Sequence, residues 1–182
     1  FPDASSVVVL CGPGNNGGDG AAIARLLNDR GASVEALLLG RISETRGDAR
    51  ANFERVKSIS DAAGSRLRFK EVESADALDD ALCKAAPEHA YDLIIDAIFG
   101  TGLTRRASGL FEEAINRINQ LADCSRVVAV DVPSGVASDS AELIGPAVRA
   151  HMTVTFTAPK TAAVLAPACA QCGELIVAQI GS

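Results

Sequence analysis

Hydrophobic positions along the chain fall into two alternating patterns: short apolar runs and longer runs with helical spacing. Runs such as VVVL, LIID and VVAV are apolar nearly throughout, which is typical of strands covered on both faces in a parallel sheet. The apolar runs predict strands over residues 5–11, 33–39, 66–70, 92–98, 126–132, 152–157 and 174–180. The amphipathic runs predict helices over residues 19–30, 44–63, 75–86 and 109–122.

This order predicts one α/β domain over residues 1–182, a doubly wound, Rossmann-like, mostly parallel sheet with helices on both faces. In such sheets ligands bind outside the carboxyl ends of the strands, and the first, fourth and fifth strands are usually neighbours. We therefore expect the segments that follow these three strands to meet in one cleft. They are GPGNNGGDG (12–20), DAIFGTG (96–102) and DVPSG (131–135).

The first of these segments is predicted to be a glycine loop between a strand and a helix. Glycine lets a ligand approach the backbone, and the N-terminus of a helix attracts anions such as a nucleotide phosphate. The glycines fit G-x-G-x-x-G, but the second strand ends in LLLG. It lacks the acid with which a dinucleotide-dependent dehydrogenase holds the ribose, which argues against that class. Asn15, Asn16 and Asp19 add polar groups that a simple phosphate cradle does not need.

Two carboxylates, Asp96 and Asp131, interrupt apolar runs at the ends of the fourth and fifth predicted strands. Burial of a carboxylate is expensive unless the group is paired, hydrogen-bonded or bound to a cation. Each could be a cap for a nearby backbone N–H, but two of them at neighbouring strand ends favour a shared site. The adjoining FGTGLTRR (99–106) offers backbone N–H groups and two arginines suited to phosphate; the alternative is a solvent-exposed loop.

Composition and charge indicate which partners the chain can have and in which compartment it works. A formal net charge of −6 with dispersed acids argues against nucleic acid. No apolar run approaches the ~20 residues of a membrane span, and no signal peptide is evident. Five scattered cysteines predict a reducing, cytoplasmic setting. Cys169 and Cys172 form a C-x-x-C in a predicted loop. This one pair, with only two histidines in the chain, is not interpreted as a zinc site, and both cysteines are interpreted as free thiols. Lys160 is expected to be solvent-exposed.

Four segments in this order, GPGNNGGDG, IDAIFGTGLTRR, VDVPSGVASD and TVTFTAPK, resemble the NAD(P)HX epimerase family, the YjeF N-terminal domain. The resemblance spans about residues 7 to 181. It implies an isomerase of nicotinamide nucleotide repair that interconverts the R and S forms of hydrated NADH and NADPH (NADHX and NADPHX). It also implies a partner dehydratase, separate or fused as a C-terminal domain, and a homodimer. Helical sequence that usually precedes the first strand in this family is expected to be missing.

The resemblance also implies residue roles. A potassium ion is expected at Asn16, Asp96 and Ser134, and phosphate in the loop from Gly100 to Arg106. Substrate contacts are expected at Asn15, Asn16, Gly17, Gly18, Asp19, Gly100, Thr101, Gly102, Leu103, Thr104, Arg105, Arg106 and Asp131.

Inversion at the hydrated carbon moves a proton on its hydroxyl, so a positioned acid–base group would help, and Asp131 is the candidate. The alternative is a non-catalytic nucleotide-binding module, or the scaffold half of a bifunctional repair enzyme. The presence of two acids favours the enzyme, since binding alone needs no second carboxylate.

Overall fold

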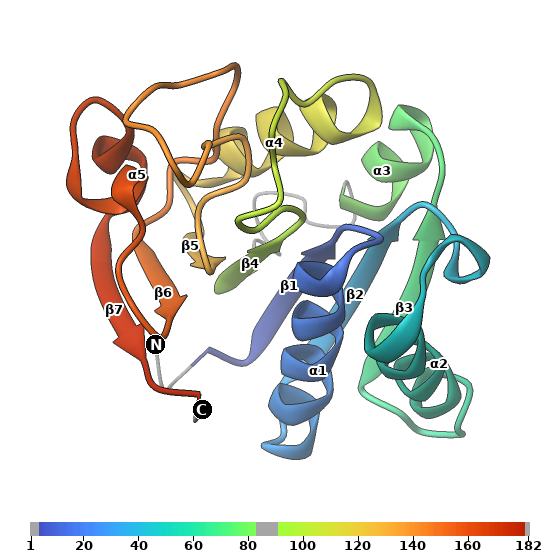
Figure 1. Ribbon diagram of the computed structural model, residues 1–182. Coiled ribbons are helices and arrows are strands. Elements are labelled where there is room, and N and C mark those ends of the chain that lie inside the picture. The colour runs from blue at the N-terminus through green and yellow to red at the C-terminus, as the bar shows by residue number, and fades with distance from the viewer. Residues whose placement is uncertain (1–3, 83–90, 181–182) are drawn as a thin grey trace.

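The computed structural model describes residues 4–82 and 91–180. Its strands form one sheet in the order β3-β2-β1-β4-β5-β6-β7, and each neighbouring pair is parallel (Figure 1). The predicted sheet is confirmed, with strand ends shifted by up to two residues. The strands are β1 (Ser6–Cys11), β2 (Ser33–Leu39), β3 (Leu67–Val72), β4 (Leu93–Ala97), β5 (Arg126–Val130), β6 (Met152–Phe156) and β7 (Glu174–Ala178).

Helices cover both faces of the sheet. On one face α1 (Asn15–Asp29) and α2 (Gly47–Ser60) pack against Val7, Val9 and Cys11 of β1. On the other, α3 (Ala75–Leu82) and α4 (Leu110–Leu121) pack against Val8 and Leu10. All five of these β1 side chains are fully buried, which explains why the run is apolar at every position rather than alternating. Shorter helices are η1 (Ile42–Glu44), α5 (Thr161–Val164) and η3 (Ala168–Gln171).

The first helix begins at Asn15, four residues before its predicted start, so most of the predicted glycine loop is helical. Glycine disfavours a helix interior by about 1 kcal/mol, which is why the pattern alone places the start later. Packing overrides this preference. A Cβ on Gly17 would overlap the carbonyl oxygen of Gly12, and one on Gly18 would lie 2.7 Å from the Cα of Ala49 in α2. These glycines allow α1 to approach the strand end and α2.

Other predicted boundaries also change. The predicted helix 44–63 divides into η1 and α2, and the predicted helix 75–86 corresponds to α3, its last four residues lying outside the described part of the chain. The C-x-x-C segment is not a loop: Cys169 lies in η3 and Cys172 caps it. The helix α5 has no counterpart among the predictions. Within residues 4–82 and 91–180, no helix is long and apolar enough to cross a bilayer.

The register of the sheet brings the ends of β1, β4 and β5 to one edge. Leu10 of β1 is level with Asp96 of β4, and Asp96 is level with Ala129 of β5. The expectation that these three strands are neighbours is therefore confirmed, and the polar segments that follow them start from one place.

Candidate active site

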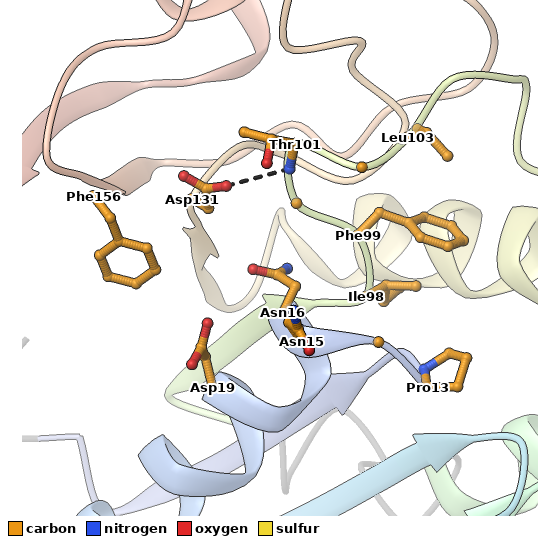
Figure 2. A pocket seen from close by; sticks show the side chains of 13 residues that line it. Pro13, Asn15, Asn16, Asp19, Ile98, Phe99, Thr101, Leu103, Asp131 and Phe156 are labelled. Atoms are coloured by element: carbon orange, nitrogen blue, oxygen red, sulfur yellow. Dashed lines mark hydrogen bonds between the residues drawn. The ribbon is translucent and has the colours of Figure 1, made fainter. Parts of the chain in front are cut away.

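A cavity of about 500 Å³ opens at this edge of the sheet (Figure 2). Its walls come from the segments that follow β1, β4 and β5, joined by one side chain from β6. The lining residues are Pro13, Gly14, Asn15, Asn16, Asp19, Ile98, Phe99, Gly100, Thr101, Gly102, Leu103, Asp131 and Phe156. The three segments thus meet in one pocket, as the sequence predicts.

The N-terminus of α1 forms one wall of this pocket. Its N-cap residue, Gly14, is extended, and no side chain caps the helix. The first turn contains no acidic residue, so its unpaired backbone N–H groups carry the positive end of the helix dipole without a competing charge. Asn15 and Asn16 lie in that turn and line the cavity. This wall suits an anionic group such as a phosphate.

Asp131 follows β5 directly and faces the cavity. Its backbone is left-handed, with φ of 70°, a conformation that costs about 1–3 kcal/mol outside glycine and persists only where the surroundings enforce it. The carboxylate is held from two other strand ends. Oδ2 accepts a hydrogen bond from the backbone N–H of Thr101 (3.2 Å), and Oδ1 accepts one from the Thr155 hydroxyl (3.4 Å). Asp131 is therefore a fixed carboxylate at the pocket wall.

Asp19 supplies a second carboxylate to the same space. In Figure 2 Asp19 rises from α1 on one side of the cavity, the Asp131 carboxylate lies on the opposite side next to Thr101, and the ring of Phe156 lies between their levels. Partial burial raises the pKa of Asp19, and the charge of Asp131 raises it further. The pair thus combines one carboxylate held by donors with one whose pKa is raised, which is an arrangement suited to acid–base chemistry.

Asp96 and Ser134 lie behind the pocket and do not line it. Asp96 is fully buried; Oδ1 accepts from the Ser134 hydroxyl (2.6 Å) and the Ile98 N–H (3.3 Å), and Oδ2 accepts from the Ser134 N–H (2.8 Å). Burial raises its pKa to about 6, although the hydrogen bonds from Ser134 act in the opposite direction. The Ser134 oxygen also accepts from the Phe99 N–H (2.9 Å). In these contacts Asp96 behaves as a cap that ties two loops together.

The amide of Asn16 bears on whether a cation fits with Asp96 and Ser134. Its amide Nδ2 is buried and has no hydrogen-bond partner. A Cβ built on Gly100 would lie 3.1 Å from both Asn16 Oδ1 and Asp131 Oδ2, so two acceptors approach the same point. If the oxygen and nitrogen of the Asn16 amide are exchanged, its N–H₂ donor faces the side of Asp131 Oδ2, and its oxygen takes the buried place that lacks a partner. With the Asp96 carboxylate and the Ser134 hydroxyl, this gives the oxygen donors that a hard cation prefers.

Several predicted contact residues lie away from the lining. Gly17 and Gly18 are buried against Gly12 and α2. Thr104, Arg105 and Arg106 are exposed and absent from the pocket wall. Arg106 donates to Glu112 of α4 at 2.6 Å, which draws its guanidinium away from the cavity. The loop therefore contributes its first four residues to the pocket and not its two arginines.

Several residues at the pocket were not predicted as site residues. Pro13, Gly14, Ile98 and Phe99 line it from the predicted segments, and two more residues come from a fourth strand end. Lys160, which was expected in solvent, is mostly buried and forms an ion pair with Asp131 at 3.2 Å. Phe156 brings an aromatic ring to the cavity from the end of β6. The sequence signal for both is TFTAPK, a further strand end on the same side of a parallel sheet as the other three.

Comparison with known proteins gives consistent matches. The chain is 43% identical over 176 residues to the bifunctional NAD(P)H-hydrate repair enzyme Nnr of Moorella thermoacetica, covering 96% of this chain and 31% of that protein. It is 40% identical over 178 residues to the NAD(P)H-hydrate epimerase of Limosilactobacillus fermentum, covering 98% of this chain and 76% of that protein. The chain thus spans about a third of the bifunctional relatives and three quarters of this shorter one.

The fold has a match among solved structures. The crystal structure of the yeast protein ynu0, YNL200c, superposes with a TM-score of 0.71 at 25% sequence identity, covering 86% of this chain and 60% of that one. The family model described as YjeF-related protein N-terminus matches residues 1–162, which include all three strand ends that form the pocket. The chain therefore belongs to the family of YjeF-related protein N-termini.

Proposed function

We propose that this chain is an NAD(P)H-hydrate (NAD(P)HX) epimerase, which interconverts the R and S forms of hydrated NADH and NADPH. The observation that carries the proposal is the pairing of Asp19 and Asp131 in a pocket whose adjacent wall is a free helix N-terminus. A phosphate cradle alone needs no carboxylates, whereas an epimerase needs proton transfer beside a phosphorylated ligand. Relatives of both kinds, epimerase and bifunctional repair enzyme, carry names that agree with this activity.

The pocket suggests how such a ligand is oriented. The N–H groups at the start of α1 and the backbone of Gly100–Leu103 suit the phosphates. The hydrated nicotinamide ring then lies toward Asp19, Asp131 and Phe156, where an aromatic side chain can pack against it. This orientation relies on helix N–H groups rather than on Arg105 and Arg106.

The reacting carbon carries a ring nitrogen and a hydroxyl. In one route a carboxylic acid protonates the hydroxyl, the C–O bond breaks, water leaves and the ring becomes an iminium. Water then adds to the opposite face and gives its proton to a carboxylate. In the other route a carboxylate takes the hydroxyl proton, the C–N bond breaks to an aldehyde, and its electron pair stays on the ring nitrogen, which takes up a proton. The nitrogen then attacks the opposite face of the aldehyde, the new hydroxyl oxygen takes back a proton, and the ring closes. Two carboxylates stabilise the positive charge of the iminium, so the first route fits this pocket better.

In that route Asp131 is the principal acid–base group, because it is fixed by donors from two neighbouring segments. Asp19 is the second group; its raised pKa favours the protonated form that can deliver a proton. The two exchange roles when the opposite epimer is bound, so that one pair serves both directions. The reaction changes neither the oxidation state nor the composition of the ligand, although in this route its hydroxyl oxygen is replaced by one from water.

A potassium ion is part of the proposal. Asn16, Asp96 and Ser134 would hold it, since the buried Asn16 amide lacks a partner and Asp96 lacks a counter-charge among its hydrogen-bond donors. The ion would supply a fixed positive charge beneath the pocket. Asn16 belongs to the pocket wall, so holding its amide also fixes the start of α1.

The proposal extends to partners. We infer a homodimer, as the family resemblance implies, and a dehydratase, separate or fused, that consumes the epimer. The bifunctional repair enzymes among the relatives agree with a fused second activity. We also infer a cytoplasmic setting, since all four cysteines in the described residues are free thiols. Light scattering of the purified chain tests the dimer; a single mass of one chain at high concentration would exclude it.

The activity is tested with the R epimer of NADPHX and a purified dehydratase specific for the S epimer. In potassium buffer, adding this chain is expected to speed the appearance of NADPH well beyond the spontaneous rate of epimerisation. A chain that binds NADP⁺ but leaves that rate unchanged would instead be a non-catalytic nucleotide-binding module.

A further inference from the structure

The ammonium of Lys160 joins three parts of the site. Lys160 is the N-cap residue of α5, and its side chain is 22% exposed. The ammonium donates to the carbonyl oxygens of Phe156 (2.8 Å) and Ala158 (3.3 Å) and lies 3.2 Å from Asp131 Oδ1. Two carbonyl oxygens and one carboxylate oxygen thus surround the ammonium. Lys160 therefore links these groups through its positive charge and does not act as a nucleophile.

The contacts of Lys160 coincide with the backbone strain of the molecule. Among the residues that the structure describes, Asp131 and Thr157 are the two outside glycine with a positive φ, at 70° and 67°. Lys160 contacts the Asp131 carboxylate directly. It also contacts the carbonyl groups on both sides of Thr157, those of Phe156 and Ala158. Such conformations persist where the surroundings over-determine them, and one ammonium does so at both positions.

Of the groups that Lys160 contacts, Asp131 and Phe156 line the pocket, while Lys160 itself does not. The Asp131 carboxylate and the Phe156 ring are pocket walls from neighbouring strands, β5 and β6. We propose that Lys160 is a positioning residue that sets the Asp131 carboxylate and the Phe156 ring in register with each other around the reacting ring of the substrate. This inference rests on the proposed epimerase function, because it assigns the two positioned groups to that reaction.

Lys160→Met tests the inference, since it removes the charge and keeps most of the side-chain length. A small displacement of a reacting group costs about 10²-fold in rate, so kcat for R-NADPHX should fall by about that factor. KM should stay within about threefold, because the helix N-terminus that suits the phosphates is untouched. Lys160→Arg returns the positive charge but places it on a planar fork, so its kcat should fall between those of Lys160→Met and the wild type.

Lys70→Met is the matched control. Lys70 pairs with Glu35 at 3.3 Å between β3 and β2, and neither residue lines the pocket. The Lys70→Met substitution therefore removes a lysine–carboxylate pair of similar geometry away from the pocket, and we expect it to leave kcat unchanged. Both variants are compared with the wild type by thermal unfolding, and a merely structural role for Lys160 would lower kcat only together with the melting temperature.

An NMR measurement makes the test independent of turnover. The Thr101 amide donates to Asp131 Oδ2, so its signal should move in Lys160→Met and stay in place in Lys70→Met. An unmoved Thr101 signal, or a kcat within about threefold of wild type, would overturn the inference. The inference would also be overturned if Lys160→Met lowered kcat only together with the melting temperature and Lys160→Arg restored neither. A wild-type chain without epimerase activity would refute the proposed function, while the Thr101 signal would still decide whether Lys160 positions Asp131.

Discussion

Asp96 and Asp131 occur in the same pattern in the sequence but have different roles in the structure. Each is a carboxylate at the end of an apolar run, and their strands, β4 and β5, are neighbours in the sheet. Asp96 is fully buried and its oxygens accept hydrogen bonds from Ser134 and Ile98. Asp131 lies one residue beyond its strand and faces the cavity.

The difference shows that position relative to the strand end decides the use of a carboxylate. Asp96 lies inside the register of three strands, level with Leu10 and Ala129, so its side chain can reach only the loops behind the pocket. Asp131 lies where β5 has ended and the backbone turns left-handed, which directs its side chain to the pocket. We expect loss of Asp96 to reduce stability and loss of Asp131 to reduce turnover.

The largest expected effect is on turnover in Asp131→Asn. Asparagine tolerates the left-handed backbone and keeps the volume of the side chain, so the fold and ligand binding should be preserved. Loss of the titrating carboxylate should lower kcat by about 10²–10⁴-fold, the usual contribution of a positioned acid–base group. Stopped assays with R-NADPHX give kcat, and calorimetry with NADP⁺ gives the affinity.

Asp19→Asn is the matched variant on the other side of the pocket. If the two carboxylates exchange roles, it should slow both directions of epimerisation as Asp131→Asn does. Turnover near the wild-type level in Asp131→Asn would show that this residue only orients the substrate, and Asp19 would then be the first candidate for the acid–base group.

The next effect is on stability in Asp96→Ala. The substitution leaves the Ser134 N–H and the Ile98 N–H without their acceptor in the protein interior, and the Ser134 hydroxyl keeps only its longer contact with the Phe99 carbonyl (3.3 Å). Unsatisfied buried donors cost about 1–3 kcal/mol each, so the free energy of unfolding should fall by about 2 kcal/mol or more. Urea denaturation measures it. Asp131→Asn should change the same quantity by less than about 1 kcal/mol, and equal losses in both variants would remove the distinction.

A smaller effect links Asp96 to potassium and pH. The pKa of Asp96 is raised to about 6, so the folded chain holds this proton more tightly than the unfolded chain does. Without potassium, its contribution to stability is therefore present at low pH and is lost as pH rises from about 4 to about 6. An ion that binds the charged form stabilises the fold above that range.

Potassium chloride, compared with choline chloride of equal ionic strength, should therefore raise the melting temperature more at about pH 8 than at about pH 5. Asp96→Asn removes the charge and should abolish the difference. Identical melting curves in the two salts at both pH values would exclude the potassium site.

The sequence predicts the sheet, the adjacency of its first, fourth and fifth strands and the meeting of three segments, because the carboxyl ends of parallel strands lie at one edge. It does not predict that α1 starts at Asn15, since the glycines at 17 and 18 are poor helix formers whose use is explained only by contacts with Gly12 and Ala49. For a related reason, the sequence does not predict that residues 156–160, at the end of β6, contribute to the site. The turn that buries Lys160 depends on backbone angles that residue types alone do not specify.

The arginines give the smallest expected effect and the sharpest contrast between sequence and structure. The sequence favours phosphate contacts from Arg105 and Arg106, whereas the structure turns Arg106 toward Glu112 and leaves both outside the pocket wall. If helix N–H groups hold the phosphates, replacing both arginines with alanine should weaken NADP⁺ binding by less than about threefold at low salt. Glu112→Gln, which frees Arg106 from its partner, serves as the companion variant. Calorimetry over a range of salt concentrations decides between the two interpretations. A tenfold or greater loss of affinity that shrinks as salt rises would mean that the loop moves on binding and brings its arginines to the phosphates, and the pocket would then be the open form of a site that closes around its ligand.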